Sequence, residues 1–499
     1  MGKPIPISLG LTSNPGRAPA AGSARPVNAY AEIAGKEQKS SEQVWSADGL
    51  RLWSNSTDTN GTRSQISVNG VLYSVRGRSI YSYDASGTER VIGGIASDAP
   101  VTMARNRRPS PQIGIVSQDG QYVVIDGGVA IDCSSLIRGG ANSICSLGGF
   151  FVFTHADGSV SHTQEDNATS IDLLAYGLAE SSADPAIRGL PKQGEVVAFG
   201  TSSIDFFSNV GGDPFAFQRN QSISLGCAAA ASCAEVDQTL MFVASDLTVR
   251  ILNGYQAVRV SNHAIERTIA AEPNISSIVA TTWTRDGHTF YCISGSTFSR
   301  VYDLSTQFWH DRETYGDTRW LASCVTAHDG DLIVGAYNSG KLYKMERTAG
   351  TEGDLPLICR LTTPPSHAYP YRLKINAVFI DMIPGVGLVG ELTSGPLLWG
   401  GAPLLWGGLP LMWGDGSFTA ATIHNADPQL MLRVSMDGGQ TFGAERTAPI
   451  GRMGETQRQI TFRRLGVTKR HGVVFELSAS AAVMRGFLGM AIDADKLQP

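Results

Sequence analysis

The sequence is poor in charge. Asp, Glu, Lys and Arg together make up 17% of its 499 residues, and the net charge is −5. A protein that holds duplex DNA through many phosphate contacts needs a strongly basic surface, so this composition argues against tight, salt-sensitive DNA binding. Long amphipathic helices are also missing. The 56 Gly and 23 Pro indicate many short strands and turns instead, and we expect an all-β protein.

The motifs of most enzymes and metalloproteins are absent. The seven cysteines include no Cys-x-x-Cys pair, so neither a zinc site nor a disulfide framework is supported; we expect small buried residues in a protein assembled in a reducing cytoplasm. There is no phosphate-binding loop, His-Glu-x-x-His or Gly-x-Ser-x-Gly motif. No apolar run reaches the roughly 18 residues of a membrane helix, and the first residues do not resemble a signal peptide. We therefore expect no catalytic residue, no metal and no cofactor.

A pair of short apolar strands around a polar turn recurs through the middle of the chain. The copies begin at residues 71, 113, 150, 196, 240, 289 and 332, so successive starts differ by 42, 37, 46, 44, 49 and 43. These differences match the roughly 40–50 residues of a propeller blade. The sequence predicts a β-propeller of seven blades, or of six if one pair belongs to a neighbouring domain. The tetrapeptides of WD40 and kelch repeats are missing, so the propeller is divergent.

The predicted propeller occupies residues 61–350 and is flanked by two different segments. Residues 1–60 are rich in Pro, Gly, Ala and Ser, and we expect an extended N-terminal arm that lies along another part of the structure. Residues 351–499 contain four strand-like segments that predict a small antiparallel β-sandwich: 373–380, 429–434, 459–465 and 473–477. Inside the propeller, the Ala-rich segment 227–233 is expected to be a crowded innermost strand, where small side chains fit near the axis.

The segment 430–446 predicts a β-hairpin with a specific turn. Apolar and polar residues alternate along its first strand, and the glycines of Asp437-Gly438-Gly439 supply positive φ in a tight turn. The turn matches the spacing Ser-x-Asp-x-Gly-x-Thr-aromatic of an Asp-box, through Ser435, Asp437, Gly439, Thr441 and Phe442. In that motif the carboxylate and hydroxyl hydrogen-bond turn amides while the aromatic ring packs on the core. We predict a structural and not a catalytic role.

A seven-residue repeat within the insertion 395–416 carries three tryptophans: Trp399, Trp406 and Trp413. A proline and a glycine in each copy exclude a continuous helix. If all three were exposed, at about 200 Å² each, they would form an apolar patch of about 600 Å², the upper limit for a monomer surface. We expect a projecting loop that packs on a neighbouring subunit or another protein; burial within the sandwich and contact with a membrane are the alternatives.

Two charged segments have competing interpretations. Arg105, Arg107 and Arg108 follow a predicted strand, either as a surface loop without a partner or as a contact with the phosphates of DNA in a channel. His310-Asp-Arg-Glu313 suggests acid–base chemistry, but a solvated strand end after an aromatic pair is the simpler interpretation. An Asp-box on a propeller also leaves open a carbohydrate-binding or sialidase-like protein. The arginine cluster, Tyr–Glu pair and acidic Asp of a sialidase form no recognisable set in the sequence.

Several segments share a pattern with one family. They are Arg25-Pro-Val-Asn-Ala-Tyr30, the early-blade segment 101–123, the central segments 199–208 and 226–245, and the C-terminal run 435–477. Together they resemble packaged-DNA stabilisation proteins, the tail hub or nozzle proteins of short-tailed bacteriophages. The tryptophan repeat departs from that pattern, so its role is not carried over.

This resemblance implies a non-enzymatic structural protein of the virion tail, assembled in the host cytoplasm. It implies a ring of identical subunits, which we expect to be a homo-hexamer, below the portal and adaptor rings. Such a ring would form a channel for non-specific passage of genomic DNA, retain the packaged DNA, and anchor tail fibre, spike or needle proteins. The three arginines are then candidate DNA-channel contacts, and the three tryptophans form a candidate interface loop.

Overall fold

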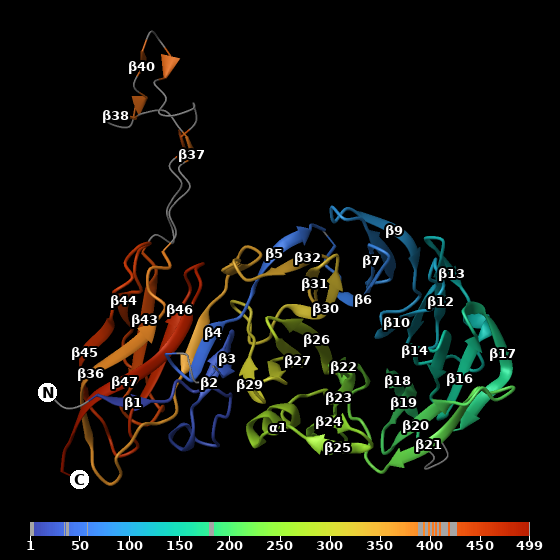
Figure 1. The fold of residues 1–499 in the computed structure, drawn as a ribbon, viewed down its shortest axis with the longest axis horizontal. Helices are drawn as coiled ribbons and strands as arrows, with labels where there is room; N and C mark the ends of the chain where they lie inside the picture. The colour runs from blue at the N-terminus through green and yellow to red at the C-terminus, as the bar shows by residue number, and fades with distance from the viewer. Residues whose placement is uncertain are drawn as a thin grey trace.

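The computed structural model describes residues 4–498 with the exception of 34, 36–38, 57, 179–183 and, within 388–426, everything but the backbone of six two-residue strands. The fold is almost entirely β-structure, and seven groups of four strands surround a central opening (Figure 1). Among the described residues there is one α-helix, α1 (His263–Ala270), which Asn262 caps by accepting hydrogen bonds from two backbone N–H groups. The all-β propeller followed by a small sandwich is confirmed, with seven blades.

The first five blades follow one another in the sequence, each from its inner to its outer strand. Their strands are β6 (Thr62–Val68), β7 (Val71–Arg76), β8 (Ser79–Tyr83) and β9 (Glu89–Gly94); β10 (Val101–Arg105), β11 (Ile113–Ser117), β12 (Tyr122–Asp126) and β13 (Val129–Asp132); β14 (Ser143–Leu147), β15 (Phe150–Thr154), β16 (Ser159–Gln164) and β17 (Asn167–Leu178); β18 (Ala186–Lys192), β19 (Glu195–Gly200), β20 (Ile204–Asn209) and β21 (Phe217–Ile223); β22 (Ala234–Val236), β23 (Thr239–Val243), β24 (Val249–Asn253) and β25 (Gln256–Arg259). Short 3-10 turns, η2 (Ser134–Leu136), η3 (Ala230–Ser232) and η4 (Ile275–Ser277), lie between blades.

The hairpins that recur in the sequence are the two middle strands of each blade. In the second blade, β11 is buried along its whole length and β12 along all but its last residue, whereas the outer strand β13 has no buried residue. The middle strands are apolar because neighbouring blades pack against both of their faces. Between the fourth and fifth blades, for example, the side chains of Phe199, Phe206 and Phe242 are fully buried together.

The last two blades connect the propeller to the rest of the chain. The sixth consists of β26 (Val279–Arg285), β27 (His288–Ser294), β28 (Ser299–Asp303) and β29 (Phe308–Asp311). The seventh contains β30 (Ala322–His328), β31 (Asp331–Ala336) and β32 (Leu342–Glu346), and its outer strand is β5 (Gly49–Ser54) from the N-terminal segment. Because β5 pairs antiparallel with β32, the propeller is closed by strands from the two ends of its own sequence.

The C-terminal part is a sandwich of two sheets (Figure 1, left). One contains β35 (Cys359–Thr362), β46 (Val474–Ala479), β43 (Gln429–Ser435) and β44 (Arg446–Pro449), and the other contains β36 (Leu373–Met382), β45 (Ile460–Val467), β47 (Gly486–Lys496), β1 (Ile5–Ile7), β3 (Ala29–Ile33) and β4 (Glu42–Ser46). Fully buried side chains such as Val378, Leu432 and Phe475 fill the space between the sheets. The short elements are η1 (Pro19–Ala21), β33 (Thr351–Glu352), β34 (Leu355–Pro356), β37 (Thr393–Ser394), β38 (Leu398–Trp399), β39 (Ala402–Pro403), β40 (Leu405–Trp406), β41 (Leu409–Pro410) and β42 (Phe418–Thr419).

Among the described strands, one pairs with both parts. β2 (Arg25–Val27) pairs parallel with β29 of the sixth blade and antiparallel with β35 of the sandwich. One sheet of nine strands therefore runs from β26, at the propeller axis, to β44 at the edge of the sandwich. The N-terminal residues that the sequence presents as an arm thus supply strands to both parts: β1, β3 and β4 to the sandwich, β5 to the propeller, and β2 to the junction.

Buried ion pairs reinforce this junction. The guanidinium of Arg25 donates hydrogen bonds to Asp311 and to Glu313. Asp311 is fully buried and also pairs with Arg300 at 3.0 Å, while Glu313 pairs with Arg360 at 2.7 Å. Burial alone would raise the pKa of Asp311, but the Arg300 and Arg25 charges outweigh it and hold this pKa below its ordinary value.

Two expectations from the sequence are wrong. Segment 310–313 is no solvated strand end: His310, Asp311 and Arg312 are all buried, because charged partners distant in the sequence neutralise the two ionised groups. Segment 227–233 is no innermost strand either. It forms η3 and leads into β22, and its small side chains allow the chain to turn close to the propeller axis.

Candidate functional site: the propeller axis and its faces

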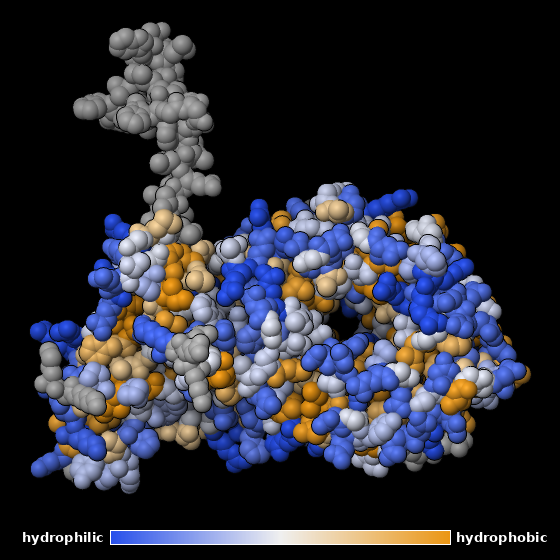
Figure 2. Space-filling view, viewed as in Figure 1, coloured by the Kyte–Doolittle hydropathy of each residue, from blue (hydrophilic) through white to orange (hydrophobic). Residues whose placement is uncertain are grey.

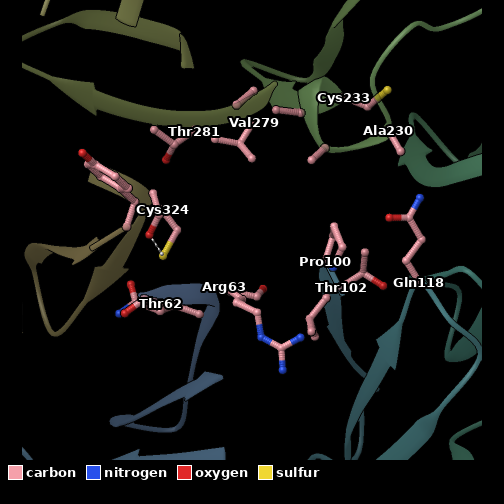
Figure 3. Close-up of a pocket in the computed structure, with 18 of the residues that line it drawn as sticks. Thr62, Arg63, Pro100, Thr102, Gln118, Ala230, Cys233, Val279, Thr281 and Cys324 are labelled. Carbon is pink, nitrogen blue, oxygen red and sulfur yellow. Dashed lines mark hydrogen bonds between the residues drawn. The ribbon is translucent and has the colours of Figure 1, made fainter. Parts of the chain in front are cut away.

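The innermost strands surround an axial cavity of about 660 Å³. Six of the seven blades line it through residues of their innermost strands, and the third contributes Asn142 just before β14. Small side chains such as Thr62, Ala230 and Thr281 stand around an open centre (Figure 3), and the space-filling view shows an opening there (Figure 2). The five-residue innermost strand β10 is roughly 16 Å long, so this volume corresponds to a mean cross-section of about 40 Å². The major groove of B-DNA alone is about 12 Å wide and 8.5 Å deep, so the cavity is too narrow for a duplex.

The charged residues around the cavity are mostly arginines. Arg63 donates hydrogen bonds to the carbonyls of Ala99 and Gly77. Arg319 stacks on Tyr337, with its Cζ 4.0 Å from the ring centroid. Arg188 has no carboxylate partner among the described residues, and burial lowers its pKa.

These arginines do not form the catalytic arrangement of a sialidase. That chemistry needs a tyrosine activated by a glutamate. Tyr337 instead donates a hydrogen bond of 2.7 Å to Asp317, and burial together with Asp317 raises its pKa, which keeps the phenol protonated. The guanidinium of Arg63 is occupied by two backbone carbonyls. The axial cavity therefore gives the glycan-cleaving alternative no support.

The three arginines proposed to contact DNA lie away from the axial cavity. Val101 and Thr102 of β10 line the cavity, and Arg105 ends that strand about 10 Å further along, at a rise of roughly 3.3 Å per residue. Arg105, Arg107 and Arg108 line a separate groove of about 510 Å³ between blade loops. All three side chains are exposed, and that of Arg107 pairs with Glu165 at 2.6 Å.

The Asp-box residues lie together in the hairpin turn between β43 and β44. The Asp437 carboxylate accepts hydrogen bonds from Ser435 Oγ at 2.8 Å, from the Gln440 and Thr441 backbone N–H groups at 3.1 and 2.9 Å, and from Thr441 Oγ1 at 2.7 Å. The Gly439 N–H donates to Ser435 Oγ at 2.8 Å. The bonds from Thr441 hold the pKa of Asp437 well below its usual range. The Phe442 ring is half-buried beneath Arg433.

The tryptophan repeat falls outside the residues whose side chains are described. Trp399 and Trp406 belong to the two-residue strands β38 and β40, which pair with β39 and β41. Trp413 lies outside the described residues altogether. Their role as an interface remains a prediction.

The described part of the chain shows neither a metal-binding cluster nor a membrane-spanning helix. No group of three or more His, Cys, Asp or Glu side chains there could hold a metal ion, and no helix there is long and apolar enough to cross a membrane. The seven cysteines are unpaired thiols.

Two features were missed by sequence reasoning: the Arg25 ion-pair network and a contact between Cys227 and Cys233. Neither leaves a local signal, because their geometry depends on the folded sheets.

One of the comparisons with known proteins identifies the family of this chain. No curated protein matches the sequence. Among solved structures, the crystal structure of the WD40 beta propeller domain of Doa1 covers 60% of this chain and 97% of its own, with 11% sequence identity and a TM-score of 0.43; a similarity this distant supports no argument. The family model described as "Bacteriophage P22 Gp10, beta-propeller" matches residues 5–350. This span begins at β1 and ends after β32, so it contains every strand of the seven blades. The chain therefore belongs to this family of phage packaged-DNA stabilisation proteins and is a structural protein of the virion.

Proposed function

We propose that this protein is a tail hub or nozzle subunit, and that copies of it form a closed ring, a homo-hexamer, around the path of the genome. The observation that carries the proposal is the nine-stranded sheet that joins the sixth blade to the sandwich. It makes the propeller and sandwich one body with a differently folded domain at each end. A head-to-tail ring needs two such complementary surfaces on each subunit.

The size of the axial cavity supports the same arrangement. A duplex does not fit within one propeller, so DNA would pass through a channel enclosed by several subunits. A net charge of −5 suits a wall along which DNA slides without strong binding. Arg105, Arg107 and Arg108, which are exposed on a propeller groove away from the axis, are candidates for a local phosphate contact.

The proposed position in the tail defines the remaining partners. The ring would receive DNA from the portal and adaptor rings, retain it in the capsid, and anchor fibres, spikes or a needle. The tryptophan-rich insertion would pack on a neighbouring subunit or one of these tail proteins.

Native mass spectrometry of the purified protein, alone and mixed with its adaptor ring, tests the ring. We expect a single closed species of six copies, at least in the mixture. A strictly monomeric protein at micromolar concentration in both samples would contradict the proposal. A second measurement addresses DNA: nanomolar binding of duplex DNA in physiological salt would contradict a channel without strong binding.

A further inference from the structure

Two cysteines meet behind the wall of the axial cavity. Cys227 precedes η3 and Cys233 follows it, and their sulfur atoms lie 3.4 Å apart. Both residues are buried, with exposures of 2% and 3%. Cys233 lines the cavity, and its sulfur is directed away from the open centre (Figure 3).

The backbone holds this pair in place from several sides. The Cys227 N–H donates to the Gly200 carbonyl at 2.8 Å, and Ala228 N–H donates to Val243 at 2.9 Å. On the other side of the turn, the Ser232 hydroxyl accepts a hydrogen bond from the Val243 N–H at 3.0 Å, and its carbonyl accepts one from the Tyr291 hydroxyl at 2.7 Å. The two sulfur atoms therefore remain neighbours without any covalent link.

The surroundings favour a reactive pair over two inert thiols. Arg188, which has no carboxylate partner within the described residues, is close enough to influence the charge of both sulfurs. Burial raises the pKa of Cys233. Burial alone would also raise the pKa of Cys227, but the hydrogen bond with Cys233 outweighs it and lowers this pKa, with smaller contributions from Ser232 and then from the Arg188 charge. A thiolate is the form of cysteine that attacks an oxidant such as peroxide.

We infer that Cys227 and Cys233 are a redox pair, which is reduced when the protein folds and is converted by peroxide into a disulfide that fixes the connection between the fourth and fifth blades. Sulfur atoms 3.4 Å apart need to approach by about 1.4 Å to reach the 2.0 Å of a disulfide bond, a distance that rotation of the two side chains can supply. The proposed function adds only the timing: assembly in a reducing cytoplasm would be followed by oxidation after release. The site itself does not depend on that function.

The reaction balances with hydrogen peroxide as oxidant. The Cys227 thiolate attacks one peroxide oxygen, the O–O bond breaks, and hydroxide leaves, which gives a sulfenic acid. The Cys233 sulfur then attacks the sulfenic sulfur, the S–O bond breaks, and the departing hydroxide takes up the Cys233 thiol proton to form water. The two sulfurs lose two electrons in total, and these reduce the peroxide.

Mass spectrometry provides a direct test. Trypsin cleaves after Arg219 and Arg250, and the peptide 220–250 contains Cys227 and Cys233 but no other cysteine. After treatment of the native protein with peroxide and alkylation in denaturant, we expect this peptide to be unalkylated and lighter by two hydrogen atoms. Cys145 and Cys292, which are buried unpaired thiols, should remain fully alkylated and serve as internal controls.

Stability provides the second measurement. Closing a short loop should raise the melting temperature by a few degrees, and a dithiol reductant should reverse the rise. The variants Cys227→Ala and Cys233→Ala should show neither the mass change nor the rise. The inference is overturned if Cys227 and Cys233 in peptide 220–250 remain fully alkylated or gain oxygen atoms instead of losing hydrogen, or if Cys145 and Cys292 oxidise first; oxygen on Met241 of the same peptide is assigned separately by fragmentation. The peptide result on the wild-type protein decides the matter even if a variant does not fold, and neither result depends on whether the protein forms a ring.

Discussion

Replacing Arg25 with alanine should weaken the junction between the propeller and the sandwich. One guanidinium in β2 bridges two carboxylates: Asp311, the last residue of the sixth blade, and Glu313, two residues beyond it. Asp311 is fully buried, and Glu313 is largely so. Removing one partner of a buried ion pair costs about 3–5 kcal/mol, because a charge remains in a poorly solvated site.

Two features reduce that figure here. Asp311 and Glu313 each keep a second arginine, Arg300 and Arg360 respectively, and the side chain of Arg25 is 34% exposed. We therefore expect Arg25→Ala to lower the free energy of unfolding by about 2–3 kcal/mol. The free energy of unfolding of Arg25→Lys should lie between those of Arg25→Ala and the wild type, since one ammonium cannot bridge both carboxylates as the several N–H donors of a guanidinium can.

Arg78 offers a matched control. It pairs with Asp98 at 3.0 Å, but the two side chains are 65% and 63% exposed, so Arg78→Ala should change stability by less than about 1 kcal/mol. Urea unfolding followed by tryptophan fluorescence measures all three variants. If Arg25→Ala and Arg78→Ala shift the midpoint equally, the ion pairs at the junction contribute no more than a surface pair, and our reasoning about this joint is wrong.

Four further predictions concern other regions. Asp437→Ala should reduce stability by about 1–3 kcal/mol through the lost turn hydrogen bonds; an unchanged melting temperature together with lost binding or cleavage of a sugar would revive the carbohydrate alternative. Burial lowers the pKa of His310 to about 4. The neutral imidazole therefore contributes roughly 3 kcal/mol to the free energy of unfolding above about pH 6.5, and this contribution is lost as the pH falls towards 4. His310→Phe should flatten the dependence of stability on pH, measured by denaturation, across this range. Neutralising the three exposed arginines Arg105, Arg107 and Arg108 should leave assembly intact. Aggregation, or loss of the ring in native mass spectrometry, would argue against a role limited to a local phosphate contact. Replacing Trp399, Trp406 and Trp413 with serine should leave the monomer folded, as measured by circular dichroism, but impair ring or tail assembly. An unfolded monomer would indicate that the tryptophans are buried within the subunit. Virions that assemble but fail at infection would indicate membrane contact.

The sequence predicted those parts of the fold that rest on local patterns. The middle strands of each blade are buried on both faces, so their apolar runs recur at blade spacing. Inner strands such as β22 are short and mix small, polar and apolar residues, and outer strands such as β25 are largely exposed, so neither produces a clear apolar run. The Asp-box could also be recognised, because the four hydrogen bonds that Asp437 accepts from described residues all come from within four positions of it.

Long-range pairings could not be predicted in the same way. β5 closes a blade whose other strands begin at Ala322, and no periodicity connects segments so far apart. The same distance explains the error at segment 310–313. Its charges suggested a solvated strand end, but Arg25 comes from the other end of the chain to pair with Asp311, and Arg312 pairs with Glu352 at 3.2 Å. A run of charged residues is exposed to solvent only if the fold brings no oppositely charged side chains to it. A single sequence does not reveal such distant partners.

The joint between propeller and sandwich has a further consequence for the ring that we propose. In a head-to-tail ring each subunit must turn the next by the same fraction of a full circle, so a hinge between the two ends of a subunit would produce rings of mixed size or open chains. A purely apolar contact allows the two domains to shift relative to each other, whereas the charge-assisted hydrogen bonds to Asp311 and Glu313 are directional and form in one relative orientation. Buried ion pairs add little net stability compared with well-packed apolar residues. We therefore infer that the Arg25 network fixes the angle between the domains, so that Arg25→Lys should broaden the distribution of assembled species in native mass spectrometry even where unfolding changes little. If the Arg25→Lys subunit is less stable but still assembles into one species of defined size in native mass spectrometry, Arg25 contributes to the stability of the subunit and not to the angle between its domains.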